Sequence, residues 1–358
     1  MKAVLRRSAF LLAAIALVPW PAQAGPVADA LDRPALSVRN PDRAVLLGAA
    51  RAGSRIVAVG ERGIVIVSDD EARHWKQAGA PVSVTLTAVK FADKDVGYAI
   101  GHGGVVLGTA DGGRRWKRLL DGRLIGRVML AAAKASGNAA ALKSADRLVN
   151  DGPDKPLLDM LVFDAKRVLV VGAYGIALFT EDGGASWSSW CARLDNPKEL
   201  HLYAVRQRGG RIAIAGEQGL VLQSLDGGAS FKRLAVPYAG SFFTAELPDD
   251  GTIVVAGLRG NVWRSADDGA SWGQVASPMP VSITASALRA DGEMLFANQA
   301  GMILGAQGGA LLPLNAIPLP PVNFVLALDR SRVLAFTVQG LQLVESRGAD
   351  DARKGASQ

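Results

Sequence analysis

A short turn motif that occurs five times is the feature of this sequence that most constrains its fold. The motif reads Ser/Thr-x-Asp-x-Gly-x-x-aromatic, and apolar or β-branched runs flank each copy. The aspartate can accept hydrogen bonds from its own turn, and glycine adopts a positive φ without steric cost, so each copy predicts a tight hairpin. These aspartate turns lie at residues 68–75, 109–116, 180–187, 224–231 and 265–272, with Ala72 replacing the glycine in the first.

A second repeat runs through the chain ahead of the aspartate turns. A β-branched run, a small turn that ends in glycine and another strand recur about 40 residues apart. The turn glycines are Gly63, Gly104, Gly175, Gly219, Gly260, Gly301 and Gly340. Four short strands per period of this length are typical of a β-propeller blade. We therefore expect an all-β, seven-bladed propeller at residues 25–347, with six or eight blades as the alternative.

The last repeat lacks a fourth strand. Its strands are expected at residues 323–328, 332–337 and 341–345, and the polar residues 348–358 are expected to be disordered. The alternating residues 34–38 precede the first blade. We expect them to supply the missing strand and to close the ring, because a closed ring leaves no open edge.

The interval between Gly104 and Gly175 is about 30 residues longer than the others. Residues 124–134 and 139–149 are rich in alanine and are separated by Ser136-Gly137-Asn138, so they predict two short helices. The insertion at about 121–156, between blades 2 and 3, is either a helical hairpin packed on the ring or a basic arm that docks a partner.

The N-terminus has the features of a cleavable signal peptide. Basic Lys2, Arg6 and Arg7 precede an apolar run, and Ala22-Gln23-Ala24 forms a small-residue cleavage site. We expect cleavage after Ala24 and a periplasmic or secreted monomer without membrane insertion, with an uncleaved anchor as the alternative. The leader accounts for three of the seven net positive charges, so the remaining charge is too small to indicate nucleic acid. The single cysteine, Cys191, excludes an internal disulfide.

Propeller geometry places the predicted turns on two opposite faces. The aspartate turns share one face, where their residues are expected to be structural: Asp70, Asp111, Asp182, Asp226 and Asp267, with Trp75, Trp116, Trp187, Phe231 and Trp272. The opposite face gathers residues that we expect to bind a partner: Arg62, His102, Tyr174, His201, Glu217, Arg259 and Asn261. The alternative is that these are solvated loop tips.

Catalytic and metal-binding patterns are weak. His74, His102 and His201 lie in three different repeats without the spacing of metal ligands, and no nucleophile or phosphate-binding motif occurs. We therefore expect no catalytic residue, metal or cofactor. A sialidase needs an arginine cluster and a tyrosine assisted by a glutamate. Arg62, Arg259, Tyr174 and Glu217 are the only candidates for those roles, and no motif supports them.

The aspartate turns resemble the Asp-box of the bacterial neuraminidase repeat. Through residues 152–159, 170–175 and 257–261, the chain is also similar to bacterial proteins related to the photosystem II stability/assembly factor. That resemblance implies an exported, seven-bladed Asp-box propeller, which in phototrophs binds a membrane-protein precursor through an arginine patch; Arg62 and Arg259 are the matching positions. In non-phototrophic bacteria, the branch that the Ala- and Arg-rich composition favours, similar proteins are encoded near exporters of the resistance-nodulation-division type.

Together these patterns indicate a non-enzymatic, exported scaffold that binds a protein partner. The partner that they favour is a membrane complex, such as an exporter, or an assembling membrane subunit. The competing hypothesis is a glycan-binding protein or a sialidase-like glycoside hydrolase that uses the same loop face. The fold alone does not decide between them.

Overall fold

The computed structural model describes residues 28–248 and 251–345. The predicted signal peptide at 1–24 and the predicted tail at 348–358 lie outside these residues. None of the described helices is long and apolar enough to cross a membrane.

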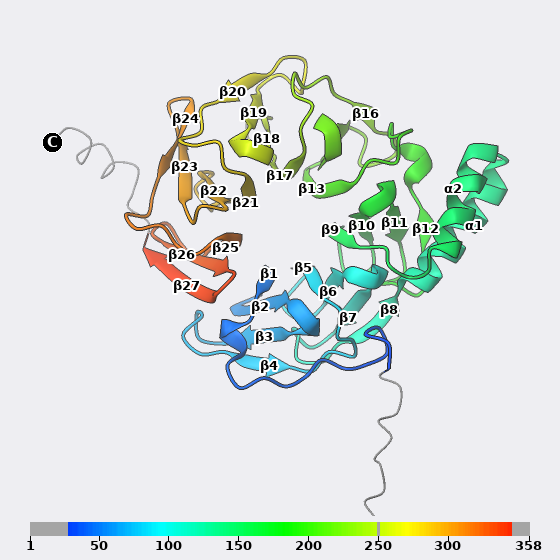
Figure 1. Cartoon of the computed structure of the whole chain (residues 1–358), viewed down its shortest axis with the longest axis horizontal. Helices are drawn as coiled ribbons and strands as arrows, with labels where there is room; N and C mark the ends of the chain where they lie inside the picture. Colours follow the sequence, from blue (N-terminus) through cyan, green and yellow to red (C-terminus); the bar gives the residue numbers. More distant parts are fainter. Residues whose placement is uncertain (1–27, 249–250, 346–358) are drawn as a thin grey trace, which may run out of the picture.

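Seven antiparallel sheets surround one axis, and each sheet is one blade (Figure 1). Six blades have four strands and the last has three, so the seven-bladed propeller is confirmed. The strands of blades 1 to 3 are β1 (Leu46–Ala52), β2 (Arg55–Gly60), β3 (Val65–Ser68), β4 (Lys76–Ala78), β5 (Leu86–Phe91), β6 (Gly97–Gly101), β7 (Val106–Thr109), β8 (Lys117–Leu120), β9 (Leu157–Val162), β10 (Val168–Gly172), β11 (Ala177–Thr180) and β12 (Ser188–Ser189). Those of blades 4 to 7 are β13 (Leu202–Arg208), β14 (Arg211–Gly216), β15 (Val221–Ser224), β16 (Lys232–Arg233), β17 (Phe242–Glu246), β18 (Ile253–Gly257), β19 (Val262–Ser265), β20 (Gly273–Val275), β21 (Ile283–Leu288), β22 (Met294–Asn298), β23 (Ile303–Gln307), β24 (Ala310–Pro313), β25 (Val322–Ala327), β26 (Arg332–Thr337) and β27 (Gly340–Glu345).

The second strand of each blade is almost completely buried. Every residue of β2, β6 and β10 is buried, because these strands have neighbouring blades against both faces. A strand covered on both sides requires a continuous apolar run rather than alternation, which is what these sequences supply. The core is therefore a series of apolar layers between successive blades. One such layer joins Leu169 and Val171 of blade 3 to Ile212 and Ile214 of blade 4.

The prediction that residues 34–38 complete the last blade is wrong. Among the described residues, blade 7 contains only β25, β26 and β27, and residues 34–38 lie along blade 1 instead. The side chain of Gln77 explains why the segment lies at blade 1. Its carboxamide makes the two hydrogen bonds that the backbone of a neighbouring strand would otherwise make. It donates to the Leu36 carbonyl oxygen at 2.9 Å and accepts from the Val38 amide at 2.9 Å. The segment is thus held at the edge of blade 1 without forming a strand.

The ring closes through side chains. Leu46 and Ile66 of blade 1 pack in one apolar layer with Leu334 and Phe336 of blade 7. The Asn323 amide also donates to the Leu46 carbonyl oxygen at 3.4 Å. Within the described residues, the seam between the first and last blades therefore depends on packing rather than on a shared strand.

The insertion between blades 2 and 3 is a helical hairpin, as predicted. Helices α1 (Gly122–Ser136) and α2 (Ala139–Asn150) stand at the outside of the ring (Figure 1). Each begins at a side-chain cap: the Asp121 carboxylate accepts from the backbone amides of Arg123 and Leu124, and Asn138 caps α2 in the same way. The buried side chain of Ile125 packs among core residues of blades 2 and 3. The hairpin is therefore packed on the ring, as in the first of the two alternatives.

Candidate functional site

Five turns of one conformation project from the face opposite the aspartate turns. They join the second and third strands of blades 1 to 5 as short 3-10 segments: η2 (Glu61–Gly63), η3 (His102–Gly104), η4 (Ala173–Gly175), η6 (Glu217–Gly219) and η7 (Leu258–Gly260). Their middle residues have positive φ values of 53° to 65°. These residues are Arg62, Gly103, Tyr174, Gln218 and Arg259, and the four with side chains are exposed. We call this surface the turn face.

A left-handed conformation is costly for residues other than glycine, by about 1 kcal/mol each. Each turn accepts it because the surrounding backbone is fixed. In η4, the Ala173 amide donates to the Pro156 carbonyl oxygen and the Ile176 amide donates to the Ala173 carbonyl oxygen. The middle residue is left outside this frame, so its side chain points away from the ring.

Four aromatic rings form a continuous row across the turn face. The ring of Tyr174 meets the edge of His201 with centroids 5.4 Å apart, and His201 lies 6.2 Å from Tyr203. Tyr203 contacts Phe243 at 5.4 Å, again edge to face. The row therefore extends from blade 3 through blade 4 to blade 5. We call these four residues the aromatic row.

Hydrogen bonds fix the blade 3 end of the row. The Tyr174 amide donates to Nδ1 of His201 at 2.9 Å, so this nitrogen is the acceptor and the neutral imidazole carries its proton on Nε2. The His201 amide in turn donates to the Glu217 carboxylate at 3.2 Å. The row is consequently a fixed part of the surface rather than a set of free loop side chains.

The structure brings together three of the seven predicted binding residues, Tyr174, His201 and Glu217. Arg259 and Asn261 lie at the other end of the row, because the Leu258 amide donates to the Ser241 carbonyl oxygen and so places η7 beside the start of β17. The Asn261 side chain is occupied, since it donates to the Leu258 carbonyl oxygen at 3.0 Å and accepts from Gln274 at 3.2 Å.

Arg62 and His102 are separate from this group. They occupy the turns of blades 1 and 2, and both side chains are exposed. Within the described residues, no hydrogen bond connects either side chain to the aromatic row. The proposed pair of arginines, Arg62 and Arg259, is thus divided between blades 1 and 5.

Sequence reasoning missed Tyr203 and Phe243 as members of one surface. The available signal was their register, since each is the second residue of an inner strand, β13 or β17, in consecutive blades. In both strands, pairing skips this residue, so both rings fall at the same irregularity of neighbouring blades, where they contact each other.

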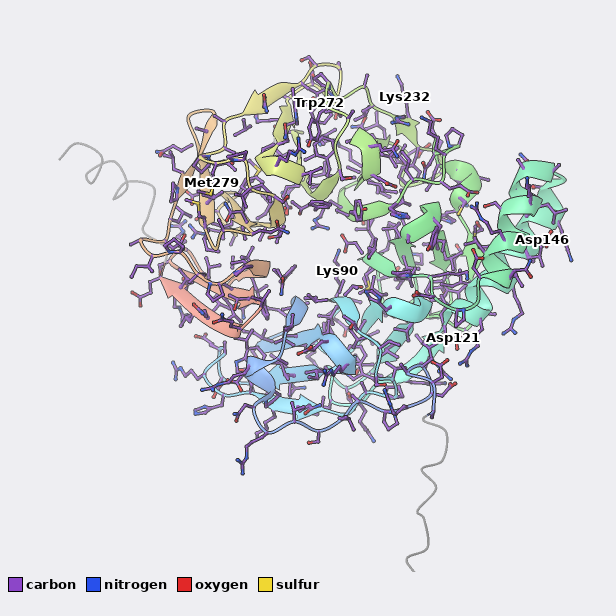
Figure 2. All side chains as sticks on the ribbon, in the orientation of Figure 1. Lys90, Asp121, Asp146, Lys232, Trp272 and Met279 are labelled. Carbon is purple, nitrogen blue, oxygen red and sulfur yellow. The ribbon has the colours of Figure 1, made fainter. Side chains whose placement is uncertain are left out.

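A second group of residues that the sequence did not predict consists of charged side chains on the inner strands, around the axis of the ring. Lys90, Asp159, Arg206 and Glu246 come from four consecutive blades, and Figure 2 places Lys90 at the inner edge of the ring. Lys90 Nζ is 2.8 Å and Arg206 Nη1 is 2.5 Å from the Asp159 carboxylate. The Glu246 carboxylate accepts from Ser286 at 2.7 Å and lies 3.8 Å from Arg206 Nε. We call these four residues the axial charge network.

Burial and the neighbouring positive charges have opposite effects on the pKa values of the two acids in this network. Burial acts to raise the pKa of Asp159, but the adjacent Lys90 and Arg206 charges hold it below its usual value. Burial raises the pKa of Glu246, and the Arg206 charge offsets this only in part. The network resembles a structural tie between blades 2 and 5 more than a reactive centre, because each acid faces a cation or a hydroxyl.

On the other face, each aspartate of the repeated motif bonds within its own turn. The Asp182 carboxylate accepts from the Thr180 hydroxyl at 2.8 Å and from the Ser186 amide at 2.9 Å, and hydrogen bonds from Ser186 lower its pKa to about 2. The same pattern occurs at Asp70, Asp111, Asp226 and Asp267. These carboxylates have little capacity left for a ligand.

In two copies of the motif, its final aromatic residue bonds back to its own turn. Trp116 donates to the Gly113 carbonyl oxygen at 3.0 Å, and Trp187 donates to Gly184 at 3.2 Å. Phe231 is buried, and Trp75 and Trp272 are half-buried. In the first turn, Ala72 takes a φ of 69°, so it adopts the conformation that glycine supplies elsewhere.

Metal ligands do not gather on either face. Among residues 28–248 and 251–345, no group of three His, Cys, Asp or Glu side chains could hold a metal ion. His74 pairs with Asp70 at 2.6 Å within its own turn, and His201 is engaged in the aromatic row.

The class of protein that the fold and the turn face define is a seven-bladed β-propeller that displays a row of aromatic side chains. One family profile, described as "Photosynthesis system II assembly factor YCF48", matches residues 139–238. The matched residues include α2 and blade 3, and therefore the start of the aromatic row.

Solved structures share the fold. The chain described as "YCF48 bound to D1 peptide" superposes with a TM-score of 0.63 and 16% identity, covering 89% of this chain and 99% of that chain. YCF48 from Cyanidioschyzon merolae superposes with a TM-score of 0.62 and 16% identity, covering 85% of this chain and 96% of that chain. A GH74 xyloglucanase from Xanthomonas campestris superposes with a TM-score of 0.58 and 14% identity, covering 85% of this chain and 52% of that chain. At these identities the likeness concerns the fold alone. No curated protein matches the chain in sequence.

Proposed function

We propose that this protein is a non-enzymatic scaffold that binds an extended segment of a client protein across its turn face. The observation that carries the proposal is the aromatic row, which presents four fixed rings from three blades. Tyrosine and other aromatic side chains provide large contact areas at low entropic cost, and they are enriched at the energetic centres of interfaces. Because the ring already holds these side chains in place, binding would lose little conformational entropy.

The comparisons support a peptide ligand of this kind. A propeller of similar fold is described as bound to a D1 peptide, and the profile of the same family matches blade 3 of this chain. We further propose that the protein is exported to the periplasm, that it acts as a monomer, and that its client is an assembling or exporter-associated membrane subunit. A glycan-cleaving function receives less support, since its candidate carboxylate, Glu217, is engaged with the His201 amide.

Site-specific photocrosslinking in intact cell envelopes tests the proposal. A photoreactive phenylalanine analogue replaces Tyr174 on the turn face or, as the control, Leu225, which is 63% exposed on the aspartate-turn face. We expect one client protein to be crosslinked from Tyr174 and not from Leu225. The client should be lost when Tyr203→Ala and Phe243→Ala are added, provided that the melting temperature shows a folded ring.

The arginines are tested in the same assay. If Arg259 contributes charge at the blade 5 end, Arg259→Ala should lower the yield about tenfold, the effect of losing roughly 1.4 kcal/mol of binding energy. Arg62→Ala should have a smaller effect, because Arg62 lies two blades from the row. Equal crosslinking from both faces, or a client retained by the double variant, would contradict the proposal.

A further inference from the structure

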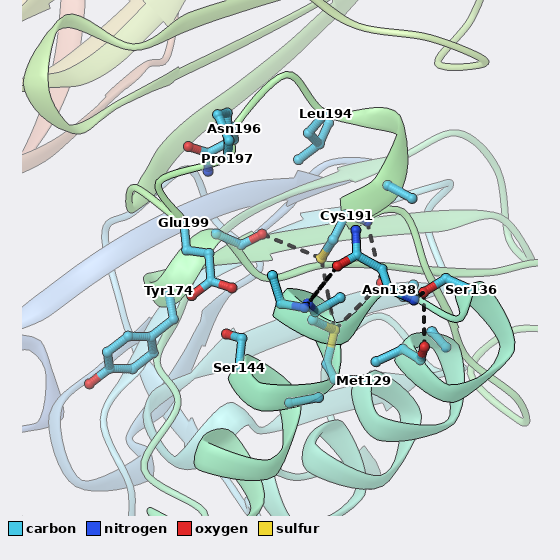
Figure 3. Close-up of a pocket in the computed structure, with 18 of the residues that line it drawn as sticks. Met129, Ser136, Asn138, Ser144, Tyr174, Cys191, Leu194, Asn196, Pro197 and Glu199 are labelled. Carbon is cyan, nitrogen blue, oxygen red and sulfur yellow. Dashed lines mark hydrogen bonds between the residues drawn. The ribbon is translucent and has the colours of Figure 1, made fainter.

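A pocket lies between the helical hairpin and blade 3, at the edge of the turn face (Figure 3). Its volume is about 590 Å³, which is in the range of sites that take small ligands or side chains. Helices α1 and α2 form one wall, and the chain from Ser189 to Glu199 forms the other. We call it the hairpin pocket.

The walls of the hairpin pocket are apolar. Alanines of both helices line one wall, and the sulfur atom of Met129 on α1 lies 3.8 Å from that of Cys191 on the opposite wall. The polar side chains of the walls are largely occupied by the protein itself. Ser136 donates to the Ala133 carbonyl oxygen, and Asn196 bonds both to the amide and to the carbonyl of Leu200. A ligand would therefore meet mainly hydrocarbon and sulfur.

The charge at the rim of the pocket is negative. Asp195 and Glu199 both line it. Glu199 pairs with Arg147 of α2 at 3.3 Å, whereas the exposed Asp195 makes no ion pair or hydrogen bond through its side chain within the described residues. The rim thus offers one carboxylate to a positively charged group.

The pocket is continuous with the aromatic row. Tyr174 lines the pocket and also contacts His201, the next member of the row. A polypeptide that lies along the row would reach the pocket at its blade 3 end. Because Arg259 lies at the blade 5 end, the two ends of this path have opposite charges.

We propose that the hairpin pocket receives an apolar side chain of the client, next to a lysine or arginine that pairs with Asp195. This inference rests on the proposed function, and it gives the client segment a direction. Its apolar and basic end lies against the helical hairpin, and an acidic residue lies toward Arg259. The hairpin is then one wall of a specificity pocket that the plain propeller repeat lacks.

The only cysteine in the chain allows the pocket to be tested without the client. Four probes are offered as mixed disulfides with 2-thiopyridine: the cysteamine amides of leucine, N-acetylleucine, N-succinylleucine and N-acetylglycine. They carry, respectively, an apolar side chain with a positive, neutral or negative charge, and no apolar side chain. Exchange joins the probe to Cys191 and releases 2-thiopyridone. Burial raises the pKa of the Cys191 thiol, so labelling is run at pH 8.5 under competing thiol and measured by intact mass.

We expect leucine amide to label most and N-acetylglycine amide least, with at least a fivefold difference in labelled fraction. Asp195→Asn should abolish the advantage of the cationic over the neutral leucine probe but leave the advantage of leucine over glycine. A purely structural role of Asp195 would not produce that split. Equal labelling by all four probes, or a preference for the succinyl probe, would overturn the proposal.

A filled pocket links this test to the client. Ala141→Phe places an aromatic ring at a half-buried position of the pocket, whereas Ala131→Phe places one at an exposed position of α1 outside it. We expect Ala141→Phe, and not Ala131→Phe, to block labelling and to reduce client crosslinking from Tyr174 at least fivefold. Unchanged crosslinking by a folded Ala141→Phe variant would overturn the inference but leave the proposed function intact. Loss of the client in the Tyr203→Ala, Phe243→Ala variant tests that function separately.

Discussion

Arg62, Tyr174, Gln218 and Arg259 have three kinds of side chain but the same left-handed backbone. Their shared conformation shows that the turn is specified by its surroundings and not by its middle residue. The next residue is always glycine, and there the reason is steric as well as conformational. At Gly63, an added Cβ would overlap the Val82 carbonyl oxygen, and at Gly219 it would overlap that of Tyr238. The glycine period could therefore be found in the sequence, whereas the role of the preceding residue could not.

Gly301 and Gly308 allow the steric cost of an added Cβ to be measured apart from the cost of a positive φ. Gly301 has a φ of 79°, and a Cβ there would overlap the Leu319 carbonyl oxygen, whereas Gly308 has a φ of 58° and open space around it. We expect Gly308→Ala to cost about 1 kcal/mol of unfolding free energy and Gly301→Ala at least about 3 kcal/mol. Urea denaturation of both variants measures this. Equal losses would mean that the backbone at Gly301 relaxes away from the contact.

The axial charge network gives a prediction with opposite signs for its two acids. Asp159 has a lowered pKa, so its stabilising effect is present above its unfolded pKa and is lost as the pH falls toward its folded pKa. Glu246 has a raised pKa, so its favourable contribution is present below its unfolded pKa and is lost as the pH rises through its folded pKa.

Asp159→Asn leaves Lys90 and Arg206 without their shared partner and should therefore cost about 3 kcal/mol at pH 7. The loss should be smaller at pH 3, where the wild-type carboxylate is closer to protonation. Glu246→Gln should cost much less at pH 7. Urea midpoints at pH 3, 5 and 7 check both variants. A larger loss for Glu246→Gln than for Asp159→Asn at pH 7 would show that the direction of these pKa shifts is wrong.

At the scale of elements, the parts set by local pattern were predictable and the parts set by distant contacts were not. The strands of blade 7 lie within one residue of their predicted positions, and the two helices lie where alanine-rich runs flank Ser136-Gly137-Asn138. Residues 34–38 have the alternation of a strand, but Gln77 supplies a competing partner that no local pattern reveals. The aromatic row and the axial charge network also escaped prediction, because each depends on the register between blades.

The segment before blade 1 yields a prediction about Leu31. This side chain is only 2% exposed and packs in the apolar layer of blades 1 and 2, while Asp32 pairs with Arg118 and Arg123. Leu31→Ala should destabilise the protein by about 2–4 kcal/mol through the cavity that it leaves. Leu36→Ala, at an exposed position of the same segment, is the matched control and should cost less than about 0.5 kcal/mol. Thermal melts of the two variants test this prediction. Similar melting temperatures would show that Leu31 does not anchor the segment to the ring.

At the scale of the whole molecule, the ring has one seam that differs from the others. Blade 7 has three strands among the described residues, and its last strand, β27, leaves Leu343 55% exposed. The seam is held by the layer of Leu46, Ile66, Leu334 and Phe336. A blade that lacks an outer strand has fewer neighbours to retain it, so local opening should begin there.

Native-state hydrogen exchange should therefore show the lowest opening free energies in blade 7. We expect amides of β26 to exchange at least tenfold faster than those of β14, the corresponding strand of blade 4. Phe336→Ala should widen the difference, because it removes a buried ring from the seam. Mass spectrometry of peptides from both strands measures the rates. Equal protection of β26 and β14 would mean that the ring opens as one cooperative unit.

The uniform frame of the five turns has a consequence for how such proteins diversify. Arginine, glycine, tyrosine and glutamine occupy one backbone geometry at the same place in different blades. An exchange at any of these positions therefore alters the recognition surface and leaves the blade beneath it unchanged. The five positions can therefore change independently during evolution. A protein of this kind can acquire a new client by single substitutions while the ring remains intact.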